Sequence, residues 1–215
     1  MNPDRIVKLS RSLANITETV GKWGSFFILP LVFVTMWDVF VRKLKFGGFS
    51  LQIWLIETFG AAFESTIIQE LEWHFHTALF ALVLGYGYIN NRHVRVDLVR
   101  ENLSFRKQAW IEFLGCTFFL VPFTSIVVWF AAEYAFGAFM TNEISASTVG
   151  LSHRWIIKSV LVVGLIFAAV SGIAVWLQTV LVLFGPKELR FDLMTLKWPE
   201  DQEKLKKLRK ELGKS

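Results

Sequence analysis

The 215-residue sequence contains one cysteine, few charged residues and no recognisable enzyme motif. Its single cysteine, Cys116, lies inside an apolar run, so a disulfide within the chain is excluded and the redox compartment stays open. There is no glycine-rich phosphate loop, no HExxH or GxSxG pattern, and no cysteine spacing typical of a metal site. These absences argue against an enzyme and against a bound metal or other cofactor.

Charged residues make up only 19% of the chain, whereas hydrophobic residues make up 53%, and the mean hydropathy is +0.46. Four apolar runs have the length of a membrane span, which a soluble domain of this size would not need. The basic residues behind the net charge of +5 lie between and beyond these runs, not on one amphipathic face. Nucleic-acid binding is therefore not expected, and membrane lipid is the predicted surrounding.

We predict an all-α integral membrane protein with four transmembrane helices in residues 1–185. The spans are expected at about 23–41, 73–89, 110–138 and 155–184. Pro122 should kink the third span, which a packed membrane helix tolerates. Between the first two spans, at about 50–67, apolar side chains recur with a helical period while Glu57 and Glu64 lie on the opposite face. This pattern predicts an extra amphipathic helix in the membrane interface.

Basic residues concentrate on one side of these four crossings. The N-terminal segment has four, the loop after the second span has five, and the tail at 186–215 has nine. The positive-inside rule therefore places both termini in the cytoplasm. The tail is charged and is predicted to be solvated and partly helical, with docking to the membrane surface or to a partner as the alternative.

Ionisable residues in or beside a span are the usual candidates for function, because placing a charge in lipid is costly. They are Asp38, Glu70, Glu72, His74, His76, Glu133 and Lys158. All lie within about two turns of the predicted outer interface, so anchoring in the interface or pairing between helices is the plainer interpretation. None is expected at mid-depth, which argues against a stand-alone carrier or channel.

A haem-binding redox subunit is an alternative. His74 and His76 share a predicted depth with His153, and a bis-histidine haem in a four-helix bundle needs such a pair across two helices. Only one pair is available, however, and His153 is expected in a loop outside the hydrocarbon. Haem binding is therefore not favoured.

Small residues recur every four positions in two of the predicted spans. They are Thr77, Ala81 and Gly85 in the second span and Gly164, Ala168 and Gly172 in the fourth. Small residues at this spacing let helix backbones approach closely in lipid. We expect the two faces to meet inside the bundle; the alternative is that one of them receives a helix from another protein.

Residues 69–98 read QELEWHFHTALFALVLGYGYINNRHVRVDL. This stretch resembles the small membrane subunit of TRAP (tripartite ATP-independent periplasmic) transporters. The likeness lies in ELEWH at 70–74, in GYGY at 85–88 and in HVRVDL at 93–98 ahead of a basic loop. The four-span layout fits the remainder of the chain, whereas the extended loop after the first span departs from the shortest members of that family.

The resemblance implies a non-catalytic subunit of a bacterial inner-membrane transporter. Its implied partner is a large permease subunit that holds the substrate and sodium sites, and a periplasmic binding protein would deliver an organic acid or related solute. Six residues are implied as docking positions. They are Glu70, Glu72 and Trp73 on the periplasmic rim, and His93, Arg95 and Asp97 on the cytoplasmic side. Arg95 and Asp97 would pair with each other or with cytoplasmic loops of the permease. For the second group, a positive-inside cluster is the plain alternative.

Overall fold

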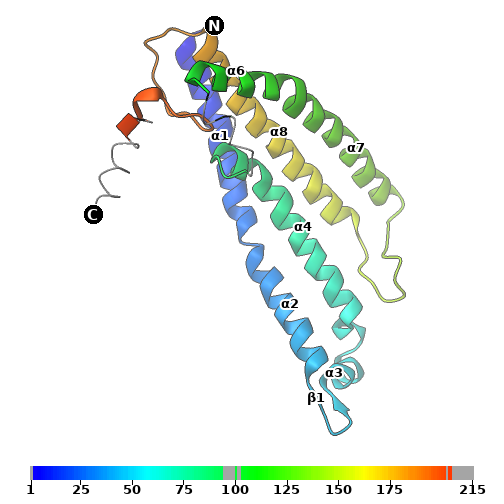
Figure 1. Ribbon diagram of the computed structural model, residues 1–215. Helices are drawn as coiled ribbons and strands as arrows, with labels where there is room; N and C mark the ends of the chain where they lie inside the picture. Colours follow the sequence, from blue (N-terminus) through cyan, green and yellow to red (C-terminus); the bar gives the residue numbers. More distant parts are fainter. Residues whose placement is uncertain (1, 94–99, 101–102, 202, 205–215) are drawn as a thin grey trace, which may run out of the picture. The chain divides into compact units, whose positions relative to one another are not determined.

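The computed structural model describes residues 2–93, 100, 103–201 and 203–204, whose regular structure is helical apart from one two-stranded hairpin. The helices are α1 (Pro3–Ser25), α2 (Ile28–Lys43), α3 (Leu51–Phe59), α4 (Ser65–Ile89), α6 (Phe105–Gly115), α7 (Val121–Met140) and α8 (Trp155–Phe184) (Figure 1). The hairpin pairs β1 (Lys45–Phe46) with β2 (Phe49–Ser50). A 3-10 turn at Ala61–Phe63 and a π-helical turn at Cys116–Leu120 complete the described elements.

Three helical segments among the described residues are long and apolar enough to cross a membrane. They are Pro3–Lys43, Phe105–Met140 and Trp155–Phe184. The last is α8, which covers the same residues as the fourth apolar run. The remaining predicted span, 73–89, lies within α4, whose first half carries glutamate and histidine side chains that lower its hydropathy. The all-helical class is confirmed for the described residues, and a fourth crossing stays a prediction.

The segment between α2 and α4 is divided, although the sequence predicted a single helix over 50–67. Helix α3 ends at Phe59 because Gly60 adopts φ +91°, a conformation that residues with a Cβ atom rarely adopt. Helix α4 then begins at Ser65, whose hydroxyl donates a hydrogen bond of 2.6 Å to Asp38 of α2. The apolar side chains that recur with a helical period over 50–67 therefore lie partly on α3 and partly on the start of α4, with a break between the two helices.

The third apolar segment departs from α-helical geometry just before Pro122. A proline has no N–H to donate, and its ring clashes with the carbonyl group four residues earlier. The π-helical turn at Cys116–Leu120 widens the helix at that point, and α7 continues beyond it to Met140. The predicted disturbance at Pro122 thus takes the form of a wide turn inside a continuous helical segment.

The chain forms two compact units. Unit 1 contains Met1–Glu18, Gly85–Ser125 and Ala168–Ser215, and unit 2 contains Thr19–Leu84 and Ile126–Phe167. In unit 1, the start of α1 packs against the end of α8 through the buried side chains of Ile6, Leu177 and Leu181. Ser10 supports this contact by donating a hydrogen bond of 2.9 Å to the Ala174 carbonyl oxygen.

The described part of the tail also belongs to the core of unit 1. Phe191 joins the apolar cluster of α1 and α8, and Leu196 is buried. The Trp198 indole donates a hydrogen bond of 2.7 Å to the Phe191 carbonyl oxygen and lies 5.2 Å from the Phe105 ring. The prediction of a solvated tail is therefore wrong for residues 189–198, because these apolar side chains find a surface to cover. Residues 205–215 lie outside the described residues.

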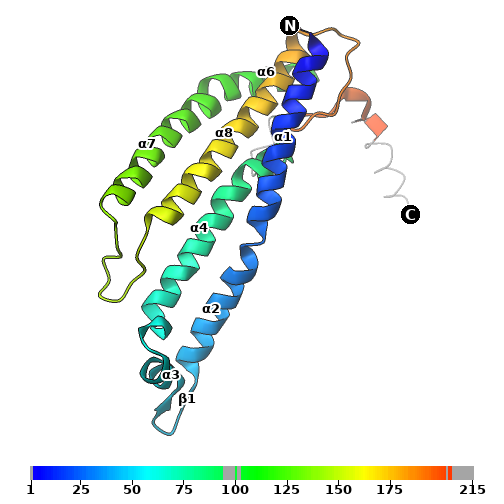
Figure 2. The same cartoon turned by 180° about the vertical axis from the view of Figure 1, so that it is seen from behind.

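In unit 2, α4 lies beside α2 and also beside α8 (Figures 1 and 2). A Cβ atom added at Gly164 of α8 would lie 2.5 Å from the backbone oxygen of Ala81 in α4, so only glycine permits this contact. Gly24 approaches Leu82 of α4 in the same way. The structure thus brings together Gly164 and Ala81, one residue from each of the two predicted stripes of small residues.

The remaining small residues are distributed differently. The atoms nearest to a Cβ added at Gly172 belong to Leu120 of the π-helical turn, within unit 1. Gly85 and Ala168 are buried in unit 1, and Thr77 is half-buried in unit 2. The Gly172 end of the fourth-span stripe therefore packs on the α6–α7 segment.

The close contact at Gly164 predicts a stability difference between two glycine substitutions. Gly164→Ala should lower the melting temperature of the full chain in detergent, because overpacking of this kind costs about 1–3 kcal/mol. Gly137→Ala is the matched control: no atom lies within 4 Å of the added Cβ. It should instead gain about 0.5–1 kcal/mol from the better helix former. Equal changes in the melting temperature of the two variants would contradict a close contact at Gly164.

The packed tail predicts that Trp198 protects the chain from proteolysis. Trp198→Ala should speed tryptic cleavage after Arg190 by roughly 5- to 30-fold, since losing about 1–2 kcal/mol of local packing raises the open fraction by that factor. Glu200→Ala is the control, because its ion pair with Arg190 is 3.4 Å long and exposed and should contribute little. Equal cleavage rates in the two variants would show that the tail is not held by Trp198.

Candidate docking sites

Glu70 ties the start of α4 to the loop between α7 and α8. Its Oε2 atom accepts a hydrogen bond of 2.6 Å from the backbone N–H of Leu151. Its Oε1 atom accepts hydrogen bonds from the hydroxyl groups of Ser145 and Ser147. One carboxylate therefore holds three points of a loop that lies more than seventy positions away in the sequence. We call Glu70, Ser145, Ser147 and Leu151 the loop clamp.

The electrostatics of the loop clamp favour a charged Glu70. Partial burial raises the pKa of this carboxyl, but the hydrogen bonds from Ser145, Leu151 and Ser147 and the nearby Arg154 charge together outweigh it. The pKa of Glu70 is therefore held below its ordinary value of 4.5. At neutral pH the loop is anchored to a carboxylate.

Trp73 belongs to a second group of contacts beside the clamp. The Arg154 guanidinium lies 5.2 Å from the centre of the Trp73 ring, a cation–π arrangement. Arg154 also pairs with Glu143 at 3.8 Å, and Glu143 in turn binds the buried ammonium group of Lys158. Lys158 lies 3.5 Å from the centre of the Tyr134 ring. The buried Lys158 charge is thus compensated within unit 2.

Glu72 has a different neighbourhood, although only two positions separate it from Glu70. It is half-buried near Asp38 and Arg42 of α2. Burial and then the Asp38 charge raise the pKa of Glu72, against the opposing effect of Arg42. Asp38 itself is 1% exposed and pairs with Arg42 at 2.5 Å. Glu72 therefore lies toward α2, whereas Glu70 and Trp73, three positions apart on the same side of the helix, lie near Arg154 and the loop between α7 and α8.

The second predicted docking group is only partly visible. His93 is exposed at the end of α4, whereas Arg95 and Asp97 lie outside the described residues. The same part of unit 1 contains a polar network that sequence reasoning missed. Its members are Tyr88, Arg100, Glu112 and Thr195. Tyr88 donates a hydrogen bond of 2.9 Å to Glu112, Arg100 pairs with Glu112 at 3.2 Å, and Arg100 donates one of 2.9 Å to the Thr195 carbonyl oxygen.

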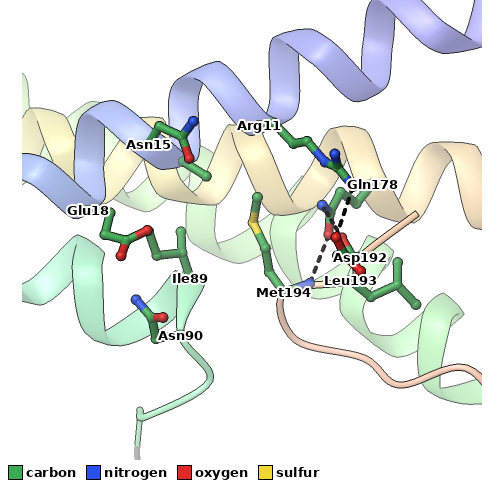
Figure 3. Close-up of a pocket in the computed structure, with 10 residues that line it drawn as sticks. Arg11, Asn15, Glu18, Ile89, Asn90, Gln178, Asp192, Leu193 and Met194 are labelled. Carbon is green, nitrogen blue, oxygen red and sulfur yellow. Dashed lines mark hydrogen bonds and ion pairs between the residues drawn. The ribbon is translucent and has the colours of Figure 1, made fainter. Parts of the chain in front are cut away.

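Unit 1 also contains a pocket of about 540 Å³, lined by residues of α1, α8, the end of α4 and the tail (Figure 3). Arg11 and Asp192 form an ion pair of 3.0 Å at its edge. Gln178 of α8 donates to the Asp192 carbonyl oxygen and accepts from the Met194 N–H, so the tail forms one wall. Because Glu18 also lines the pocket, it carries charges of both signs and favours neither an anion nor a cation. The two hydrogen bonds of Gln178 hold the tail in place.

His74 and His153 bind neighbouring groups in their own segments. The Nδ1–H of His74 donates a hydrogen bond of 2.6 Å to the Glu70 carbonyl oxygen, and its ring lies 4.0 Å from that of Trp73. His153 bonds to the hydroxyl group of Ser152 through Nδ1, and His76 is exposed. Among the described residues, no group of three or more His, Cys, Asp or Glu is placed to hold a metal ion.

Many large apolar side chains are exposed along the long helices. Within unit 2, α7 buries only Ala135 and Ala138 and exposes its large side chains. Trp129 is 67% exposed and Phe130 is 64% exposed. A water-soluble protein rarely exposes this many large apolar groups together, whereas lipid or a membrane partner would cover them.

The long apolar helices, joined by hydrogen bonds and ion pairs near their ends, are the features of a helical membrane protein. The family model described as "Tripartite ATP-independent periplasmic transporters, DctQ component" matches residues 31–181. The chain therefore belongs to this family, the small membrane components of TRAP transporters. This confirms the resemblance seen in residues 69–98 and extends it from α2 to α8. No curated protein and no solved structure matches the chain.

The loop clamp predicts that Glu70→Gln loosens the loop between α7 and α8, because a neutral amide is a weaker acceptor than a carboxylate. Hydrogen exchange at the Leu151 amide should become faster by roughly tenfold, the effect of losing about 1.4 kcal/mol from a charged hydrogen bond. Glu72→Gln is the matched control and should leave this amide unchanged. Equal exchange in both variants would show that Glu70 does not hold the loop.

The same contact has a pH dependence of known sign. Since the folded pKa of Glu70 is lowered, its stabilisation is complete above its ordinary value of 4.5 and is lost as the pH falls through the lower folded value. Protection of the Leu151 amide should therefore be constant near neutral pH and decline only in acid. In Glu70→Gln this acid-dependent decline should be absent.

Proposed function

We propose that this chain is the non-catalytic scaffold of a TRAP transporter and supports a large permease subunit in the bacterial inner membrane. The match to the DctQ component family carries this proposal. The permease would hold the solute and sodium sites, and a periplasmic binding protein would deliver an organic acid or related solute. The exposed apolar helix faces support it, because they give a larger membrane partner a surface to cover.

In the membrane we place four crossings, made by α2, residues 73–89 of α4, the α6–α7 segment and α8, all within residues 1–185. Both termini face the cytoplasm, as the distribution of basic residues favours. Helix α3 then lies at the outer interface with its large apolar side chains toward lipid, and the loop clamp faces the periplasm. The loop that Glu70 holds is our candidate contact for the binding protein.

The permease would dock on one face of α7, which we call the α7 face. It comprises Trp129, Glu133, Phe136, Gly137 and Met140, which lie on one side of the helix at positions i, i+4, i+7, i+8 and i+11. All five are exposed in unit 2. A glutamate facing lipid is costly, so a protein neighbour suits Glu133 better than acyl chains do.

Gly137 adds a steric argument for the α7 face. No atom lies within 4 Å of a Cβ added there, so its smallness serves no contact among the described residues. Glycine on a membrane helix lets a neighbouring helix approach closely. The outward side of α2 offers the contrast: Val32, Phe33 and Met36 are exposed there, and the helix contains no glycine. We assign α2 to lipid and the α7 face to the permease.

Gly137→Leu tests this assignment. The variant should melt no lower than the native subunit, because the site is open, but it should retain less permease during co-purification of the tagged complex. Val32→Phe on α2 is the matched control and should retain permease as the native chain does. Loss of permease in both variants, or in neither, would remove the α7 face from the proposal.

Co-purification also separates the rival functions. A scaffold brings down a much larger apolar partner, a stand-alone carrier is isolated alone, and a haem protein shows a Soret band. In vesicles, uptake should require the permease and the binding protein together with this chain. Solute movement by the isolated chain would overturn the scaffold role.

A further inference from the structure

The C-terminal end of α2 carries three basic residues that the scaffold role leaves unexplained. Arg42 and Lys43 form its last turn, and Lys45 begins β1. Together with Val39 they line a pocket of about 420 Å³ within unit 2. All three basic side chains are exposed. Such a cluster at the predicted outer end of a span runs against the positive-inside rule and therefore calls for a neighbouring negative charge.

The protein supplies only part of that charge. Arg42 pairs with the buried Asp38 at 2.5 Å, which fixes the guanidinium at one side of the pocket. Lys43 and Lys45 have no ion pair among the described residues. The C-terminus of α2 contributes a partial negative charge of about half a unit, well below the charge of two ammonium groups. The pocket is therefore suited to an anion.

The surroundings of the pocket are apolar. Met36 and Phe40 are exposed on α2, which leads up to the pocket, and Phe46 and Phe49 are exposed in the hairpin beyond it. In Figure 1, the hairpin and α3 gather at this end of α2. Cations at the edge of a broad apolar surface match a molecule with a charged head and a hydrocarbon tail. A soluble acidic protein would match the cations but not the exposed phenylalanines.

We propose that this pocket binds the phosphate of an anionic phospholipid whose acyl chains lie along α2. Lys43 and Lys45 contact the phosphate, and Arg42 completes the cradle from the position set by Asp38. Val39 contacts the first carbons of the acyl chains. The proposal rests on the membrane placement given under the proposed function, but it does not depend on the α7 face or on the permease.

Photo-crosslinking in nanodiscs tests the site on the full chain. The probe is phosphatidylglycerol with a photoreactive group in its acyl chain, and adducts are mapped by mass spectrometry. We expect adducts on α2 near Val39 and Phe40. Lys43→Gln combined with Lys45→Gln should lower the preference for this lipid over phosphatidylcholine by roughly 30-fold, about fivefold for each basic residue. The charge-preserving pair Lys43→Arg and Lys45→Arg should keep the labelling.

Each alternative occupant gives a distinct result. Equal labelling by a phosphatidylcholine probe, or unchanged labelling in the double glutamine variant, would show that no anion-selective lipid site exists. Displacement of the lipid by millimolar inorganic phosphate would assign the pocket to a soluble anion. Displacement by the purified periplasmic binding protein would assign it to that protein, and either displacement would overturn the lipid proposal. Failure of permease co-purification would leave the labelling result intact, so the two proposals fail separately.

Discussion

Close contact between helix backbones holds unit 2 together, and the rest of its surface follows from that constraint. In lipid, no hydrophobic force draws large side chains inward, so helices associate through tight packing and polar bonds. At Gly164 the α8 backbone meets that of Ala81, and a side chain of any size would part them. Helix α7 likewise buries Ala135 and Ala138 and turns its aromatic rings outward. Small residues inside the unit and large residues on its surface therefore have the same cause, namely close packing of the helix backbones.

Near the helix ends, hydrogen bonds and ion pairs between polar side chains also hold the elements of unit 2 together. Asp38 joins α2 to Ser65 at the start of α4, and Glu70 joins α4 to the loop before α8. Glu143 compensates the buried ammonium group of Lys158. Removing one partner of such a pair leaves the other buried and unsatisfied, so these bonds are costly to break. Among the described residues these ionisable groups are therefore committed to contacts within the subunit.

Sequence patterns predicted what depends on local composition. Helix α8 occupies the fourth apolar run because a thirty-residue, predominantly apolar segment can satisfy its backbone in lipid only as a helix. The break at Gly60 was missed, since a hydrophobic period does not register one residue with positive φ. The sequence identified Glu70 as a polar residue at a helix entrance but not as the anchor of Leu151, because that partner is 81 positions away. Trp198 was assigned to a solvated tail for the same reason: its packing surface on Phe105 and Phe191 is set by tertiary structure.

The family match covers residues 31–181 and so leaves out all of α1 and the tail. Yet these two segments pack with the end of α8 in one cluster, where Ile6 and Phe191 lie against Leu177 and Leu181. The Ser10 hydroxyl bonds to the α8 backbone, and the Arg11–Asp192 pair links α1 to the tail. Such contacts make the flanking segments part of the fold of unit 1, since each buries apolar surface that would otherwise face water or headgroups. The regions outside the family match are therefore structural in this chain, and the α7 face and the loop clamp proposed as docking surfaces both lie inside the shared region from α2 to α8.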